Sequence, residues 1–131
     1  MIIIIVGDDT LVERVCVELA AGGGAEVRVV FPMSAERREA LQRAGAAVTA
    51  HDPDSDDGLL EAGVADAAAI LTLSANDEQN LAVALRARML NPRIRVVLRQ
   101  FGTRIGRKIE QNLPDSTVLS LAAHSAATYA G

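Results

Sequence analysis

A six-residue segment near the N-terminus has the position of a phosphate-binding loop but only part of its chemistry. It follows Ile2–Val6, a run of β-branched residues typical of a buried strand, and it leads into a helical pattern. Residues 7–12 read Gly-Asp-Asp-Thr-Leu-Val, where a loop that binds a dinucleotide reads Gly-x-Gly-x-x-Gly. Gly7 matches the first glycine, whereas Asp9 and Val12 stand in place of the second and third.

The two replacements change what this loop can hold. The second glycine lets the backbone approach a pyrophosphate, and the third allows a helix and a strand to lie close together. Asp8 and Asp9 suit a helix N-terminus as capping groups, but their charges repel a phosphate from that position. We therefore expect impaired classical dinucleotide binding, with Gly7 needed mainly for the turn. A metal ion or an amine in place of the phosphate is the alternative that the two aspartates leave open.

A second acidic segment invites a calcium interpretation. Asp52, Asp54 and Asp56 have the one-three-five spacing of an EF-hand loop. The sixth position is Asp57 and not glycine, and the twelfth is Gly63 and not glutamate, so the EF-hand match fails. The first three aspartates are weak candidates for a looser oxygen site, and a solvated acidic turn is the favoured interpretation.

The composition of the 131-residue chain excludes several classes of function. Its net charge of −4 and its aromatic content of 2% argue against a nucleic-acid partner. No apolar run approaches the roughly 20 residues that cross a bilayer. Cys16 is the one cysteine, which fits a reducing cytoplasm, and its helical surroundings predict a core residue. No serine or histidine stands in a nucleophile–base pattern, so we expect no enzyme activity.

Strand and helix patterns alternate along the whole chain. Strands are expected at residues 2–6, 27–31, 46–50, 67–73, 94–98 and 117–119. Helices are expected at residues 10–21, after a cap at Ser34, at 58–62, between 74 and 90, at 103–112 and at 120–130. This alternation predicts an α/β fold of the Rossmann type, a doubly wound parallel sheet of about six strands in the order 3-2-1-4-5-6. We expect a single domain over residues 1–131, excised from a longer chain because it starts on a strand and ends in a helical pattern.

Several motifs occur in the order and spacing of one protein family. They are the opening strand that ends at Gly7, Ala-Glu-Arg-Arg at residues 35–38, and Asp52 with Leu-Leu-Glu-Ala-Gly-Val-Ala-Asp-Ala at 59–67. The strongest set is Leu-Thr-Leu-Ser at 71–74, Asn-Asp-Glu-Gln-Asn-Leu at 76–81, Asn-Pro at 91–92 and Val-Val-Leu-Arg at 96–99. On these motifs the chain resembles the RCK family, the Trk-type NAD-binding domains that regulate conductance in potassium channels and transporters.

The resemblance implies a binding cleft at the carboxyl ends of the strands, where open parallel sheets bind ligands. Its residues here would be Gly7, Asp8, Asp9, Thr10, Phe31, Asp52, Ser74, Asn80 and Arg99. Phe31 departs from the family, whose ligand-binding members have an acidic residue there that holds the ribose. Phenylalanine cannot replace it in this role, because its side chain accepts no hydrogen bonds from ribose hydroxyls. Three roles stay open: Asp52 could serve a turn, Asn80 could bond a neighbouring strand, and Arg99 could pair with a carboxylate or meet an anion.

The resemblance further implies a cytoplasmic regulatory domain of a potassium channel or Trk-like transport system. NAD or an adenine nucleotide would be its cofactor by family, although the altered loop leaves the ligand unknown. Its partners would be a second copy, in a homodimer or larger RCK assembly, and a membrane-embedded channel or transporter subunit at the cytosolic face of the plasma membrane. Leu81, Leu85, Met89 and Leu121 are candidate core or interface positions, with the core expected for each. The alternatives are a conventional NAD(H)- or ATP-binding domain with an altered loop, and a purely structural dimerisation domain of a tandem protein.

Overall fold

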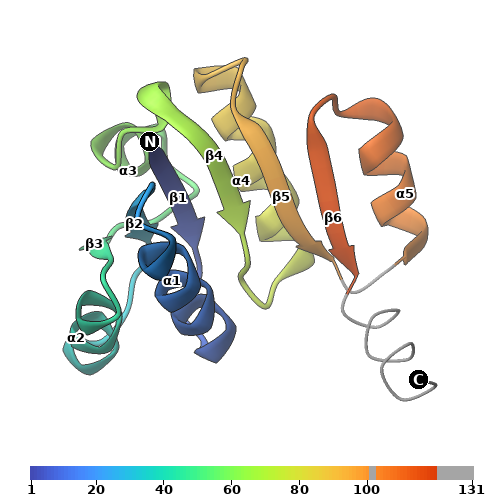
Figure 1. Cartoon of the computed structure of the whole chain (residues 1–131). Coiled ribbons are helices and arrows are strands. Elements are labelled where there is room, and N and C mark those ends of the chain that lie inside the picture. The colour runs from blue at the N-terminus through green and yellow to red at the C-terminus, as the bar shows by residue number, and fades with distance from the viewer. Residues whose placement is uncertain (101–102, 121–131) are drawn as a thin grey trace.

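A computed structural model describes residues 1–100 and 103–120 of the chain. Within them, six parallel strands form one sheet in the order β3-β2-β1-β4-β5-β6, with helices on both faces (Figure 1). The predicted doubly wound α/β fold and its strand order are therefore confirmed. Because the order reverses between β1 and β4, the carboxyl ends of these strands mark the place where such sheets bind ligands.

The elements follow the predicted alternation of strands and helices. The strands are β1 Ile2–Val6, β2 Glu26–Val30, β3 Ala47–Thr49, β4 Ala67–Thr72, β5 Arg95–Gln100 and β6 Ser116–Ser120. The helices are α1 Thr10–Gly22, α2 Ala35–Arg43, α3 Asp56–Glu61, α4 Asp77–Leu90 and α5 Thr103–Asn112, with a 3-10 turn, η1, at Val64–Asp66. The helix predicted at 120–130 lies outside the described residues, apart from Ser120, which ends β6.

Some boundaries differ from the prediction because side-chain caps and strand pairing set them. α3 begins at Asp56, two residues early, because the hydroxyl of Ser55 caps it by accepting a hydrogen bond from the Gly58 N–H (3.2 Å). β5 continues two residues beyond its predicted end, to Gln100, because its last residues pair with β6. The cap predicted at Ser34 is present at the start of α2.

The sheet carries a separate apolar cluster on each face. Ile4 belongs to the cluster that α3, α4 and α5 cover, and Ile5 belongs to the one that α1 and α2 cover. Both are fully buried, as alternation of successive strand residues requires when helices lie on both faces. Cys16 of α1 lies fully buried in the second cluster, so its predicted place in the core is confirmed.

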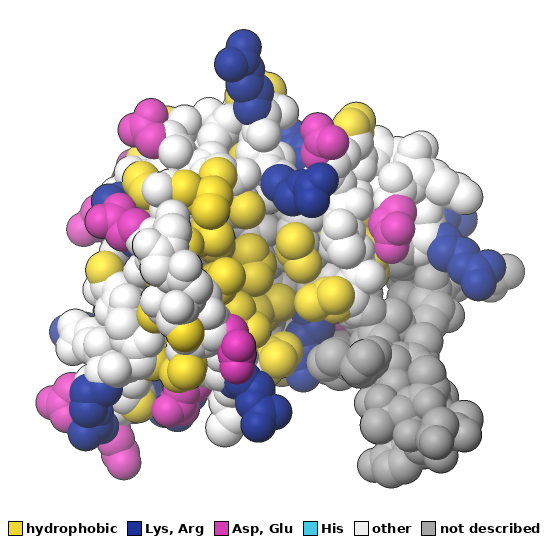
Figure 2. All heavy atoms as spheres, viewed as in Figure 1, with side chains coloured by type: hydrophobic (Ala, Val, Ile, Leu, Met, Phe, Trp, Pro, Cys, Tyr) yellow, Lys and Arg dark blue, Asp and Glu magenta, His cyan; other side chains and the backbone are white. Residues whose placement is uncertain are grey.

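Two apolar surfaces remain partly open to solvent. Figure 2 shows hydrophobic side chains gathered beside α1, over the part of the sheet where Figure 1 shows β4 and β5 with no helix in front. On α4, Leu85 and Met89 are 45% and 83% exposed, so the prediction that they belong to the core was wrong. Leu81 is half-buried against the core, and Leu121 lies outside the described residues. Among the helices of the described ranges, none combines the length and the apolar character that crossing a membrane requires.

Candidate functional site

The turn at Gly7 joins β1 to α1 with a backbone that no side chain would fit. Gly7 is buried and its φ is +141°, in the region that favours glycine. A Cβ atom there would lie 2.8 Å from Cγ2 of Val12 and 3.3 Å from the carbonyl carbon and oxygen of Leu73. Val12 is itself fully buried, so its side chain fills the space beside Gly7 that a glycine at position 12 would leave empty. Gly7 therefore serves both the turn and the close approach of the chain to the end of β4.

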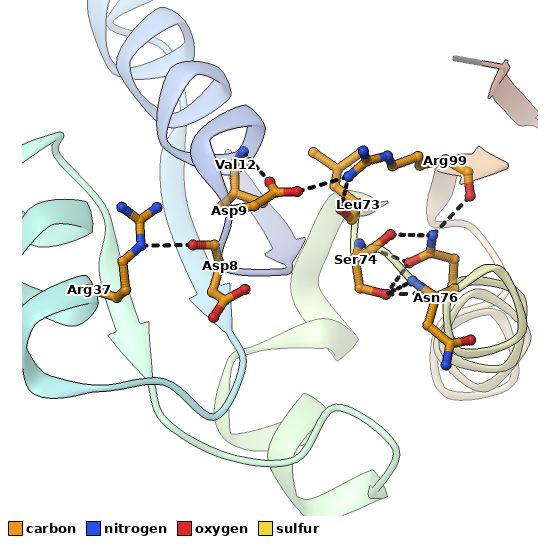
Figure 3. Close-up of polar contacts among 9 residues, drawn as sticks. Asp8, Asp9, Val12, Arg37, Leu73, Ser74, Asn76 and Arg99 are labelled. Atoms are coloured by element: carbon orange, nitrogen blue, oxygen red, sulfur yellow. Dashed lines mark hydrogen bonds and ion pairs between the residues drawn. The ribbon is translucent and has the colours of Figure 1, made fainter. Parts of the chain in front are cut away.

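The carboxylate of Asp9 caps α1 and joins it to β5 (Figure 3). Its Oδ1 accepts a hydrogen bond from the Val12 N–H at 3.2 Å, and its Oδ2 pairs with Nη1 of Arg99 at 2.9 Å. The same Nη1 donates to the carbonyl of Leu73 at 3.1 Å, so Arg99 reaches across the end of β4. The Arg99 side chain is 13% exposed and that of Asp9 is 39% exposed. Of the two roles left open for Arg99, pairing with a carboxylate is the one observed.

A second arginine holds the other side of the same turn. Nε of Arg37, in the first turns of α2, donates to the backbone carbonyl of Asp8 at 2.8 Å, and its Nη1 pairs with Glu13 at 3.2 Å. Figure 3 shows Asp8 and Asp9 between Arg37 on one side and Arg99 on the other. The sequence placed Arg37 in a motif but predicted no role for it. Its partners Glu13 and Asp8 lie 24 and 29 residues away in the chain, so the sequence pattern does not reveal these contacts.

Ser74 and Asn80 form a buried hydrogen-bonded bracket between the ends of β4 and β5. Oδ1 of Asn80 accepts from the N–H and the hydroxyl of Ser74, both at 2.9 Å. Its Nδ2 donates to the backbone carbonyls of Ser74 and Arg99, also at 2.9 Å. Asn80 is fully buried and Ser74 is 5% exposed. The amide therefore bonds the neighbouring strands, which is the structural alternative that the sequence left open for it.

The remaining candidate residues lie apart from this network. Phe31 follows β2, is half-buried against the cluster under α4, and donates its N–H to the Thr49 carbonyl at 3.2 Å. Thr10 is the exposed first residue of α1. Asp52 is exposed, and its Oδ1 accepts from the Asp54 N–H at 2.9 Å, as in a turn.

The acidic loop shows contacts with nearby polar groups and no gathering of ligands. Oδ2 of Asp54 accepts from the Gln79 amide at 3.4 Å, and Asp56 pairs with Arg86 at 2.7 Å. Across residues 1–100 and 103–120, no three His, Cys, Asp or Glu side chains are grouped so that they could hold a metal ion. The weak candidates Asp52, Asp54 and Asp56 are thus not brought together as a site.

Comparisons with known proteins agree with this architecture. The family model for the TrkA-N domain matches residues 3–119. The chain is similar to the TrkA-N domain of the inner membrane protein ybaL from Escherichia coli, with a TM-score of 0.85, 17% identity, and coverage of 98% of this chain and 93% of that one. No curated protein matches the sequence.

Two further solved structures share the fold at similar identity. One is the Kef CTD of Shewanella denitrificans in an AMP-bound form (TM-score 0.71, 16% identity, 100% of this chain and 82% of that chain). The other is the GsuK channel bound to NAD (TM-score 0.71, 20% identity, 88% of this chain), of which the match spans 21%. At these identities the likeness establishes the fold alone.

Proposed function

Because the chain belongs to the TrkA-N domain family, we propose that it is a regulatory domain of a potassium channel or Trk-like potassium transport system. The match over residues 3–119 carries this proposal, since it spans nearly the whole chain. Structural neighbours that include the Kef CTD and the GsuK channel support it. The domain would act at the cytoplasmic face of the membrane, by binding and not by catalysis, and a membrane-embedded subunit would be its partner.

Uptake of rubidium, a tracer for potassium, tests this assignment. Host cells that lack the coding sequence of the domain should take up rubidium at a rate different from that of cells that carry it. Cells that carry a Gly7→Ala variant should behave like the deletion, because that change disturbs the turn at the end of β1. Identical uptake in all three strains would count against a role in potassium transport.

We propose that classical dinucleotide binding is impaired in this domain. The Asp9 carboxylate stands at the N-terminus of α1, where a pyrophosphate would need bare backbone N–H groups. Val12 fills the space beside Gly7, and Phe31 offers no acceptor for ribose hydroxyls. A ligand, if one binds, would regulate by its differential affinity for two arrangements of paired domains.

Thermal unfolding with NAD, NADH, ATP, ADP, AMP and calcium separates this proposal from its alternatives. A ligand at about 100 times its Kd stabilises a domain by about 2.7 kcal/mol, which raises Tm by roughly 8 °C. We expect no such rise with NAD or NADH at about 100 μM. A rise with either one would favour the conventional dinucleotide-binding domain, and no rise with any ligand would favour the purely structural one.

We also propose that the domain forms a homodimer through α4 and α5. A hollow of about 310 Å³ lies between these helices, lined by Leu81, Leu85, Ile109, Leu113 and two polar residues. Met89 protrudes one helical turn beyond Leu85 on α4. If two α4 helices packed antiparallel about a two-fold axis at Leu85, Met89 of each copy would lie opposite Leu81 of the other. The protruding side chain and the hollow are therefore complementary on one surface, as a two-fold interface requires.

Light scattering coupled to size-exclusion chromatography tests this interface. The wild-type chain should elute as a dimer, and Met89→Glu should lower the dimer fraction at least about tenfold because it would bury a charge. Val17→Glu is the matched control, since Val17 is 49% exposed on α1, away from α4 and α5. A monomeric wild type, or equal effects of the two variants, would refute the assignment.

A further inference from the structure

The Asp9–Arg99 pair makes the contacts that the oxygens of an anionic ligand would make at this place. Anions bind helix N-termini through backbone N–H groups, and arginine commonly adds charge-assisted hydrogen bonds to them. Here one oxygen of the Asp9 carboxylate accepts a hydrogen bond from the Val12 N–H, and the other accepts one from Nη1 of Arg99. The carboxylate thus joins the same two kinds of donor, one on α1 and one from β5.

Arg99 is held at both its ends, which fixes the direction of its side chain. Its backbone carbonyl accepts from Nδ2 of the buried Asn80 at 2.9 Å, and its Nη1 also donates to the Leu73 carbonyl at 3.1 Å. The Arg99 side chain is 13% exposed, so it is largely removed from water. A charge in that position is costly to leave without an opposite charge.

We propose that the Asp9 carboxylate serves as an internal anionic ligand that determines the specificity of the cleft. It neutralises Arg99, and it joins the start of α1 to the end of β5 without any bound molecule. It also keeps the phosphate of any outside ligand away from this position. This inference rests on the proposed impairment of dinucleotide binding and deepens it, and pyrophosphate binding by Asp9 variants tests it separately from NAD binding by the wild type.

Asp9→Ser separates the charge of Asp9 from its capping role. Serine is a strong N-cap, so the hydrogen bond to the Val12 N–H can be kept while the ion pair with Arg99 is lost. Arg99 and the start of α1 would then face a space left by the carboxylate. Inorganic pyrophosphate, a compact anion with several acceptor oxygens, is the probe that we choose to fill it.

The experiment measures Tm by circular dichroism during titration with pyrophosphate, against sodium chloride of equal ionic strength. Asp9→Ser should melt below the wild type, and pyrophosphate at about ten times its Kd should raise the Tm of this variant by about 4 °C. The wild type should not respond, because its own carboxylate holds the position. Asp9→Ser combined with Arg99→Gln should also fail to respond, because the cation is gone.

Asp56→Ser is the matched control, since it removes an exposed ion pair with Arg86 elsewhere on the surface. It should melt like the wild type and show no response to pyrophosphate. Asp9→Asn, which nearly preserves the shape of aspartate and is also a strong cap, serves if Asp9→Ser does not fold. An equal response of the wild type and the Asp9 variants, or none in either Asp9 variant, would overturn the proposal.

Discussion

Gly7 carries the tightest steric demand at the candidate site. Its positive φ is uncommon for any residue with a side chain, and the backbone of Leu73 lies within 3.3 Å of the place that a Cβ would occupy. The closest neighbour, Cγ2 of Val12, belongs to a packed side chain with little room to move. Gly7 is thus required by the fold, independently of any ligand.

We expect Gly7→Ala to lower the free energy of unfolding by about 2–4 kcal/mol, because it adds backbone strain to overpacking. Urea unfolding followed by circular dichroism measures the change. Gly24→Ala is the control, because a Cβ there would meet nothing within 4 Å and the loss should stay near zero. Equal midpoints for Gly7→Ala and the wild type would contradict the steric account.

Single-residue roles were predictable from the sequence where they depend on neighbours in the chain. The turn at Gly7 and the cap at Ser34 are of this kind, since each is set within a few residues. The partner of Arg99 was not, because Asp9 lies 90 residues away and only the folded sheet brings the two together. The sequence left two partners possible for Arg99, a carboxylate of the chain or a bound anion, and the folded structure shows the carboxylate.

At the scale of elements, α4 holds the ends of its two neighbouring strands. Asn76 caps the helix, Asn80 brackets the ends of β4 and β5, and Asn91 closes the other end of the helix. Nδ2 of Asn91 donates to the carbonyls of Val64 and Ala67, both at 3.0 Å, where η1 leads into β4. The amides of Asn80 and Asn91 thus fix the two ends of the helix against the sheet.

Asn80→Ala should lower the free energy of unfolding by about 3 kcal/mol, because it removes the buried hydrogen bonds that the Asn80 amide makes with Ser74 and with the Arg99 carbonyl. Chemical denaturation in the absence of any nucleotide provides the measurement. The matched control is Asn112→Ala, which removes an exposed amide bonded to the Lys108 carbonyl and should cost under about 0.5 kcal/mol. Similar losses for both variants would argue that Asn80 has no structural role of this kind.

The elements themselves were predictable because the hydrophobic period changes clearly between strands and helices. Boundaries were placed less accurately than the elements: β3 is confined to Ala47–Thr49, within the predicted 46–50, and α4 begins at Asp77, three residues after the predicted start. The exposed stripe at Leu85 and Met89 was misjudged for another reason. Helical periodicity identifies an apolar face, but it does not say whether the rest of the molecule covers that face.

At the scale of the whole molecule, Cys16 reports how firmly the layer formed by α1 and α2 is held to the sheet. It belongs to α1 and is fully buried in the apolar cluster between this helix and the sheet. Burial, with a smaller contribution from the Glu13 carboxylate, raises the pKa of its thiol from 9.0 to about 11. Since the thiolate is the reactive form, both access and ionisation protect Cys16 in the folded state.

The raised pKa also gives the sign of a pH effect on stability. Because the folded state disfavours the thiolate, the contribution of Cys16 to stability is fully present below pH 9 and is lost as the pH rises towards about 11. We expect the urea midpoint of the wild type to fall over this range by more than that of Cys16→Ala. Parallel pH profiles for the two chains would contradict the assigned pKa.

Labelling of Cys16 with a thiol reagent at pH 8 should therefore require opening of the domain. We expect the native chain to react at least about 100-fold more slowly than the chain unfolded in urea. The control is Val17→Cys in a Cys16→Ala background, which moves the thiol by one residue to a site that is 49% exposed and should react rapidly without unfolding. Any ligand that binds the folded domain should slow the labelling of Cys16 and leave that of the control unchanged, because only the former depends on global opening. Equal rates for the two thiols would mean that α1 leaves the sheet far more readily than its buried contacts imply.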